Sequence, residues 1–140
     1  MKNKAPLALM EQLIMLLVFA LAAALCLQVF VYSAQVSCRC EAQANAAAAV
    51  QNAAEIAKAY RGDTAQISKR LGGCETADGW QLRYDANWQP IEAENAAYTV
   101  LILPQPTEHP ALGGARIIAA DGTETVFELA VYWQEEIHES

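Results

Sequence analysis

Hydrophobic residues form one long block near the start of the chain and shorter, periodic patterns after it. No charged residue occurs from Gln12 to Cys38. The uncharged block is longer than the roughly 20 residues that a helix needs to cross a hydrocarbon core about 30 Å thick. The pattern predicts one transmembrane helix at residues 7–36, with Leu13 to Val36 inside the bilayer, after a short basic leader at residues 1–6.

The charges on either side of the block predict its orientation. Lys2, Lys4 and the α-amino group precede it, and the nearest bases after it are Arg39 and Lys58. The positive-inside bias therefore predicts a single-pass protein of the cell membrane with a cytoplasmic N-terminus and an extracytoplasmic C-terminal domain. The formal net charge of the chain is −7, so nucleic acid is not an expected partner, whereas the lipid bilayer is.

A cleaved secretory signal is the alternative to an anchor. In that case Lys2 and Lys4 would form its basic region, with a small-residue cleavage site at residues 31–33. Apolar regions of signal peptides run about 7–15 residues, and this block is longer, which favours an uncleaved anchor. A lipoprotein is disfavoured because Leu25 directly precedes Cys26 and Gln35 lies three residues before Cys38, so neither neighbourhood has the small-residue pattern that lipidation of a cysteine needs.

An alanine-rich segment follows the block. Glu41 to Tyr60 contains no Gly or Pro, so its helix propensity is high. Apolar residues recur there at intervals of three and four, which predicts one packing face: Ala46, Val50, Ala53, Ala57 and Tyr60, with Ala49 and Ile56 beside them. Residues 37–60 are therefore expected to continue the span as one helix, about 80 Å long from Leu7 to Tyr60.

A connecting segment at residues 61–78 follows this helix. Gly62 is expected to end the long helix, and Asp63 to cap a short one at Thr64–Leu71 that Gly72-Gly73 ends. Arg61-Gly62-Asp63 is also the minimal integrin-binding string, but turn formation between two helices explains these residues sufficiently.

Period-two alternation then predicts a β-sheet domain at residues 79–134. Trp80, Leu82 and Tyr84 alternate with polar residues, and the turn Asp85-Ala86-Asn87 predicts a hairpin toward Trp88 and Ile91. The following elements are a continuously apolar central strand at Tyr98–Leu103, a loop bracketed by Pro104, Pro106, Pro110 and Gly113-Gly114, and a hairpin at Asp121-Gly122 between Ala115–Ala120 and Thr123–Trp133.

The predicted fold class is therefore α+β. A long N-terminal helix, membrane-spanning in its first half, packs on a small antiparallel sheet of four or five strands. In the last strand Phe127, Leu129, Val131 and Trp133 are expected on one face and Val126, Glu128, Ala130 and Tyr132 on the other. Residues 135–140 form an acidic tail.

Glu11 is the one acid at the beginning of the apolar block. An ionisable group beside a span is a functional candidate when a cationic partner can be named, although a carboxylate can also lie simply in the headgroup layer. The stretch from Leu7 to Leu17 resembles the N-terminal signature of type IV pilins and of type II secretion pseudopilins. In that family a basic leader precedes an apolar helix whose fifth mature residue is Glu, and this arrangement of a long helix before a sheet is pilin-like.

The resemblance implies processing and assembly. The leader would be cut between Pro6 and Leu7, where the family usually has Gly before the cut and Phe or Met after it. Leu7 would become the methylated N-terminal residue, and Glu11 would pair with the terminal amine of a neighbouring subunit. The implied partners are other pilin-like subunits, a prepilin peptidase and an inner-membrane assembly platform, in a pilus or a secretion pseudopilus.

Four cysteines leave several alternatives open. Cys26 lies in the span and is expected to pack as a small hydrophobe. Cys38 and Cys40 lie about 200° apart on a helix and cannot bond each other. One of them can pair with Cys74, bridge to a neighbouring subunit or be palmitoylated, or the three can stay free. No zinc-ligand spacing is present.

No enzyme motif emerges, so no catalytic residue, metal or cofactor is expected. His109 lies among prolines and His138 in the tail, each without a sequence neighbour that would make it a catalyst. Trp80, Trp88 and Trp133 are expected to form core, although three tryptophans can also line a carbohydrate or peptide platform. The sequence thus predicts an assembling structural subunit; the alternative is a membrane-tethered binding or sensing domain that does not polymerise.

Overall fold

The computed structural model of the protein describes residues 4–135. It contains a long helix α1 (Lys4–Ala59), a short helix α2 (Thr64–Leu71) and five strands: β1 (Cys74–Thr76), β2 (Gly79–Tyr84), β3 (Tyr98–Gln105), β4 (Leu112–Asp121) and β5 (Glu124–Gln134). The chain divides after Cys40 into two compact units. We call residues 4–40 the apolar segment of α1, and residues 41–135 the α+β unit.

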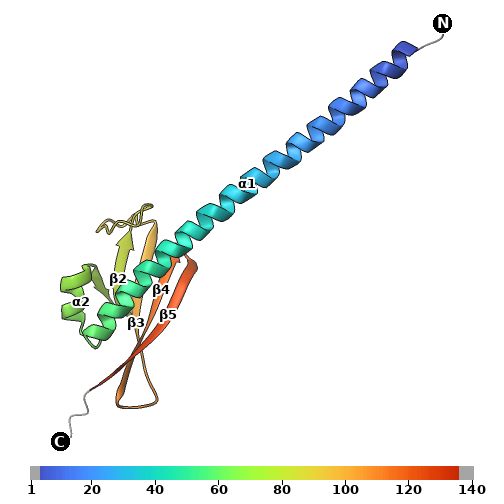
Figure 1. Ribbon diagram of the computed structural model, residues 1–140. Helices are drawn as coiled ribbons and strands as arrows, with labels where there is room; N and C mark the ends of the chain where they lie inside the picture. Colours follow the sequence, from blue (N-terminus) through green and yellow to red (C-terminus); the bar gives the residue numbers. More distant parts are fainter. Residues whose placement is uncertain (1–3, 136–140) are drawn as a thin grey trace, which may run out of the picture. The chain divides into compact units, whose positions relative to one another are not determined.

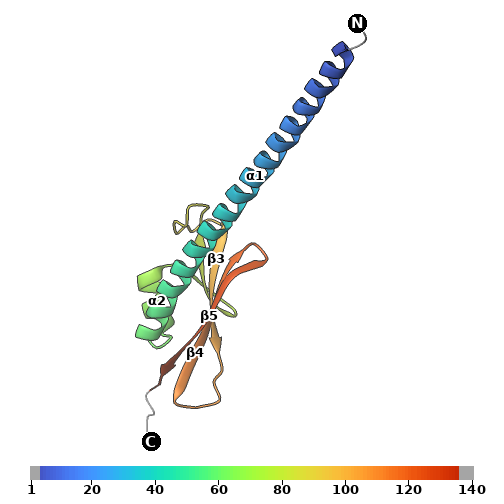
Figure 2. The same cartoon turned by 45° about the vertical axis from the view of Figure 1, so that its right-hand side comes forward.

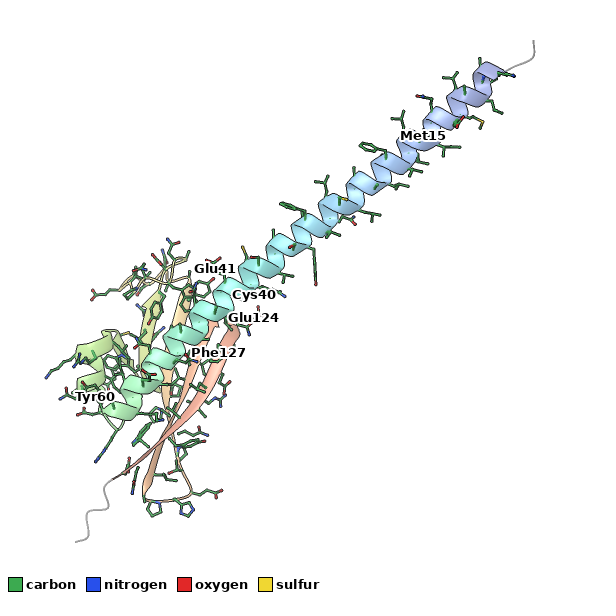
Figure 3. All side chains as sticks on the ribbon, in the orientation of Figure 1. Met15, Cys40, Glu41, Tyr60, Glu124 and Phe127 are labelled. Carbon is green, nitrogen blue, oxygen red and sulfur yellow. The ribbon has the colours of Figure 1, made fainter. Side chains whose placement is uncertain are left out.

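The apolar segment is helical throughout, as predicted. Every residue from Lys4 to Glu41 is exposed, and the side chains project from all sides of the helix (Figure 3). Among the described residues α1 is the one helix long and apolar enough to be a candidate membrane span. Pro6 lies in its first turn, where the missing N–H removes no helical hydrogen bond.

Helix α1 ends just before Gly62, as the sequence predicts. Arg61 and Gly62 both have positive φ, 50° and 76°, and the Gly62 N–H donates to the Ala57 carbonyl at 2.9 Å. The Asp63 side chain then accepts a hydrogen bond from the Ala65 N–H at 3.0 Å, which caps α2. Both sequence predictions for this turn are confirmed.

The five strands form one antiparallel sheet in the order β1-β2-β3-β4-β5, so each strand pairs with its sequence neighbour. The predicted central strand is β3, in the middle of the sheet. The Asp121-Gly122 hairpin is also confirmed, with Asp121 opposite Glu124 and Gly122 at φ 59°. Within the α+β unit, α1 lies across one face of the sheet and α2 beside the end of α1, in both views (Figures 1 and 2).

The core of the α+β unit lies between α1 and this face. Its helical side is made of small residues, and its sheet side includes two alanines among larger apolar groups. The fully or nearly fully buried members are Ala46, Val50, Ala53, Ala54 and Ala57 from α1, Ile67 from α2, and Trp80, Leu82, Val100, Ile102, Ala115, Ile117, Ala119 and Val131 from the sheet. The predicted face of the alanine-rich segment is therefore the buried one, and the α+β fold class is confirmed.

The turn predicted at Asp85-Ala86-Asn87 is present, but the hairpin is shorter than predicted. The chain returns along β2 with one antiparallel bridge, from Tyr84 to Pro90, and the Ile91 N–H donates to the Arg83 carbonyl at 2.9 Å. The Asp85 carboxylate accepts hydrogen bonds from the N–H groups of Asn87 and Gln89, at 2.8 and 2.9 Å, which holds a compact turn in place of a ladder. A hairpin that was not predicted lies earlier, between β1 and β2, so the sheet begins at Cys74 and not at residue 79.

The predicted proline- and glycine-rich loop is also shorter than expected. Pro104 belongs to β3, while Gly113 and Gly114 belong to β4. The glycines are in the strand because they lie opposite Trp133 and Tyr132 of β5 and leave room for those rings. The irregular segment between the two strands is therefore residues 106–111.

Candidate functional site

The residues to which the pilin resemblance would assign processing and assembly all lie in the apolar segment. Pro6, Leu7 and Glu11 are helical and exposed. Leu7 and Glu11 are four residues apart and so share one face of α1. Among residues 4–135, no side chain forms an ion pair or hydrogen bond with Glu11, which leaves its carboxylate available to another molecule.

The four cysteines are free and exposed, and the described part of the chain contains no disulfide. Cys38 and Cys40 are both in α1, and Cys74 begins β1 in the other unit. Across the described ranges, no group of three or more His, Cys, Asp and Glu side chains is arranged to hold a metal ion.

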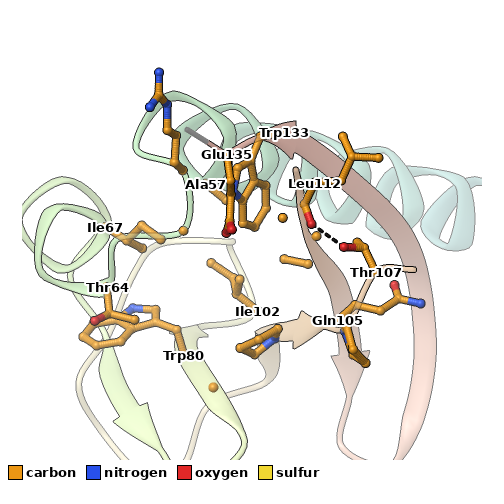
Figure 4. A pocket seen from close by; sticks show the side chains of 18 of the residues that line it. Ala57, Thr64, Ile67, Trp80, Ile102, Gln105, Thr107, Leu112, Trp133 and Glu135 are labelled. Atoms are coloured by element: carbon orange, nitrogen blue, oxygen red, sulfur yellow. Dashed lines mark hydrogen bonds between the residues drawn. The ribbon is translucent and has the colours of Figure 1, made fainter. Parts of the chain in front are cut away.

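A groove opens in the α+β unit where α1 ends. Its volume is about 670 Å³, and its walls come from the turn after α1, from α2, from the sheet and from segment 106–111. Trp80 and Trp133 lie on opposite sides of Ile102 (Figure 4). The Trp80 indole N–H is already used, because it donates to the Gly72 carbonyl at 2.8 Å. Most of the groove surface is apolar, as in many ligand-binding clefts.

Two glycines leave the space that the Trp133 ring fills at this groove. A Cβ on Gly62 would lie 2.8 Å from the Trp133 ring, and one on Gly113 would lie 2.2 Å from its Nε1. The ring therefore fits between the α1–α2 turn and β4 only because neither residue has a side chain. The Trp133 Nε1 atom is buried and has no hydrogen-bond partner. Among the described residues, the Gln105 Oε1 atom is also buried without a partner.

The histidine and the prolines predicted to lie in a loop contribute to the rim of the groove. His109, Pro106 and Pro110 line it. The His109 carbonyl accepts hydrogen bonds from the Leu112 N–H and the Thr107 hydroxyl, each at 3.0 Å, so segment 106–111 is internally bonded. His138 and most of the acidic tail lie outside the described residues.

Trp88 belongs to a separate aromatic cluster. It has φ 58° and stacks on Tyr98 with ring centroids 4.2 Å apart, and Tyr84 lies 5.6 Å away on a tilted plane. Burial raises the pKa of the Tyr84 hydroxyl above its usual range, because the charged phenolate would lose solvation. The three tryptophans thus do not form one platform: Trp80 and Trp133 share the groove, whereas Trp88 packs at the edge of the core.

Comparison with known proteins adds no assignment. No protein-family model matches the chain, and the searches of curated proteins and of solved structures gave no match.

Proposed function

We propose that the protein is a single-pass, membrane-anchored structural subunit that resembles a type IV pilin or a type II secretion pseudopilin. Its role is to assemble with other pilin-like subunits through α1. The observation that supports this proposal best is the composition of one helix: α1 is exposed and apolar over its first part and packs on a five-stranded sheet over its last part.

The chemistry of the apolar segment supports assembly over simple tethering. A tether needs only apolar length, whereas this helix also carries Glu11 just before its uncharged stretch. A carboxylate near hydrocarbon is stabilised by a cationic partner. The free amine of a processed neighbour, four residues or about 6 Å along the helix before its own Glu, provides such a partner near the same end of the span.

The first experiment is the intact mass and N-terminal sequence of the protein purified from its native membrane. We expect a chain that begins at Leu7 and carries an additional methyl group. A chain that begins at Met1 would contradict processing and favour the tethered domain. A chain that begins near Ala34 would mean that the protein is secreted, and would contradict both.

Replacing Glu11 with Ala should leave membrane insertion intact and reduce assembly. Truncating one partner of a desolvated charge pair costs about 2–5 kcal/mol, which corresponds to a loss of more than roughly tenfold in association. The measurement is the amount of subunit, self or partner, that co-purifies from detergent-solubilised membranes. Glu41→Ala is the matched control, because Glu41 is an exposed acid of the same helix beyond the uncharged block; an equal effect of both substitutions would remove the assigned role of Glu11.

The groove supports the second candidate function, a tethered binding domain that does not polymerise. Its indole walls suit a ligand with a large apolar surface. A protein that stays monomeric in native membranes, yet whose tryptophan fluorescence changes on titration with a peptide or oligosaccharide, would favour this function over assembly.

A further inference from the structure

Gln28 is a polar side chain in the middle of the uncharged block. Its carboxamide has two N–H donors and a carbonyl acceptor, and lipid tails satisfy none of them. All residues from Lys4 to Glu41 are exposed, so no described part of this chain covers Gln28. If α1 spans a membrane, the partner of this amide must come from another molecule.

The residues around Gln28 form one face suited to a second helix. At about 100° per residue, Ala20, Ala24, Gln28, Val31 and Gln35 fall within about 80° of arc, and we call them the glutamine face. Alanine at two of these positions lets another backbone approach closely. A shallow hollow lies over the C-terminal part of this face, lined by Leu27, Gln28, Val31, Tyr32 and Gln35.

We propose that the glutamine face is the contact between parallel α1 helices of two copies of this chain, with the Gln28 amides paired across it. This inference rests on the membrane anchoring in the proposed function. The occupant is a second copy because a carboxamide is self-complementary: each can donate to the other and accept in return. Two copies inserted in the same direction also place Gln28 opposite Gln28 and Gln35 opposite Gln35 at the same depths.

The cysteines provide an internal test of this face. Cys38 is three residues after Gln35 and lies about 40° from the centre of the glutamine face, whereas Cys26 and Cys40 lie about 160° from it. A disulfide requires Cα atoms about 4.4–6.8 Å apart. Parallel helices that meet on this face bring two Cys38 residues within that range and keep two Cys40 residues on opposite outer surfaces.

The experiment uses full-length chains in native membranes, each retaining one cysteine of α1. The Cys38-only chain carries Cys26→Ala, Cys40→Ser and Cys74→Ser, and the Cys40-only and Cys26-only chains are built in the same way. Molecular oxygen with a copper catalyst is the oxidant: two thiols lose two protons and two electrons, and one S–S bond forms. The readout is the fraction of covalent dimer on a non-reducing gel.

We expect the Cys38-only chain to give about tenfold more dimer than the Cys40-only or Cys26-only chain. Adding Gln28→Leu should lower the Cys38 dimer by about threefold to tenfold, because the interhelical amide bonds are lost. Gln28→Asn should retain most of the dimer. Val29→Leu, a substitution outside the glutamine face, is the matched control and should change little.

The possible failures are distinguishable. Dimers formed mainly through Cys40 or Cys26 would overturn the assigned face and leave self-assembly in place. No dimer through any of the three would overturn this face and also count against self-assembly through α1. A Cys38 dimer that Gln28→Leu does not reduce would overturn the amide pairing.

Discussion

Replacing Trp133 with Ala is expected to lower the free energy of unfolding of the α+β unit by about 3 kcal/mol, at the lower end of the 3–5 kcal/mol typical of buried tryptophan. The ring occupies the space that Gly62 and Gly113 leave open, and it connects β5 to the turn after α1. Alanine leaves that space as a cavity. The groove should lose one wall at the same time, because Trp133 lines it.

The measurement is urea unfolding of the full chain in detergent micelles, followed by far-ultraviolet circular dichroism. Tyr132→Ala is the matched control: it removes the neighbouring aromatic of the same strand, whose side chain is 51% exposed. Surface substitutions usually change the free energy of unfolding by no more than about 0.5 kcal/mol. An equal loss for the two variants would contradict the structural role of Trp133.

Gly113 and Trp133 also show what the sequence alone could not reveal. Gly113-Gly114 beside three prolines predicts a loop, because both residue types favour turns. The structure instead pairs Gly113 with Trp133 and Gly114 with Tyr132. A glycine in a strand opposite an aromatic is a known packing arrangement, but recognising it requires the register of strands twenty residues apart. The groove depends on the same pairing, so local patterns could not predict it.

Local signals were sufficient where short-range chemistry decides the structure. The end of α1, the Asp63 cap and the Asp121-Gly122 hairpin depend on neighbouring residues, and all three are confirmed. The turn at Asp85-Ala86-Asn87 also forms, with its N–H groups bonded by the Asp85 side chain, but the return along β2 stops at one bridge. Strand β1 was not predicted, because Cys74-Glu75-Thr76 has no apolar alternation.

Some features of the candidate sites could likewise be predicted from local sequence, and others depend on the tertiary fold. The apolar segment and Glu11 could be identified from sequence because a membrane span depends on composition and not on tertiary contacts. The placing of Trp80 and Trp133 in one groove, with Trp88 elsewhere, depends on strand order. Pattern alone therefore predicts the long apolar helix and the fold class, whereas the surface of the α+β unit required the structure.

Replacing Ala53 with Glu should destabilise the α+β unit by several kcal/mol, because an unpaired carboxylate would enter its core. Ala53 is 0% exposed and lies on the face of α1 that packs on the sheet. The core there is built from small residues on both sides, including Ala115 and Ala119 of β4. A longer side chain would also push the helix away from the sheet, which adds a packing penalty of about 1–3 kcal/mol.

Ala48→Glu is the matched control, since Ala48 is exposed on the same helix. The two variants have the same composition and net charge, and Glu is nearly as good a helix former as Ala. Any difference in urea unfolding therefore reports burial alone. We expect Ala48→Glu to unfold like the unmodified chain and Ala53→Glu to lose most of its cooperative transition. Equal behaviour of the two variants would contradict the packing of α1 on the sheet, on which the fold of the α+β unit depends.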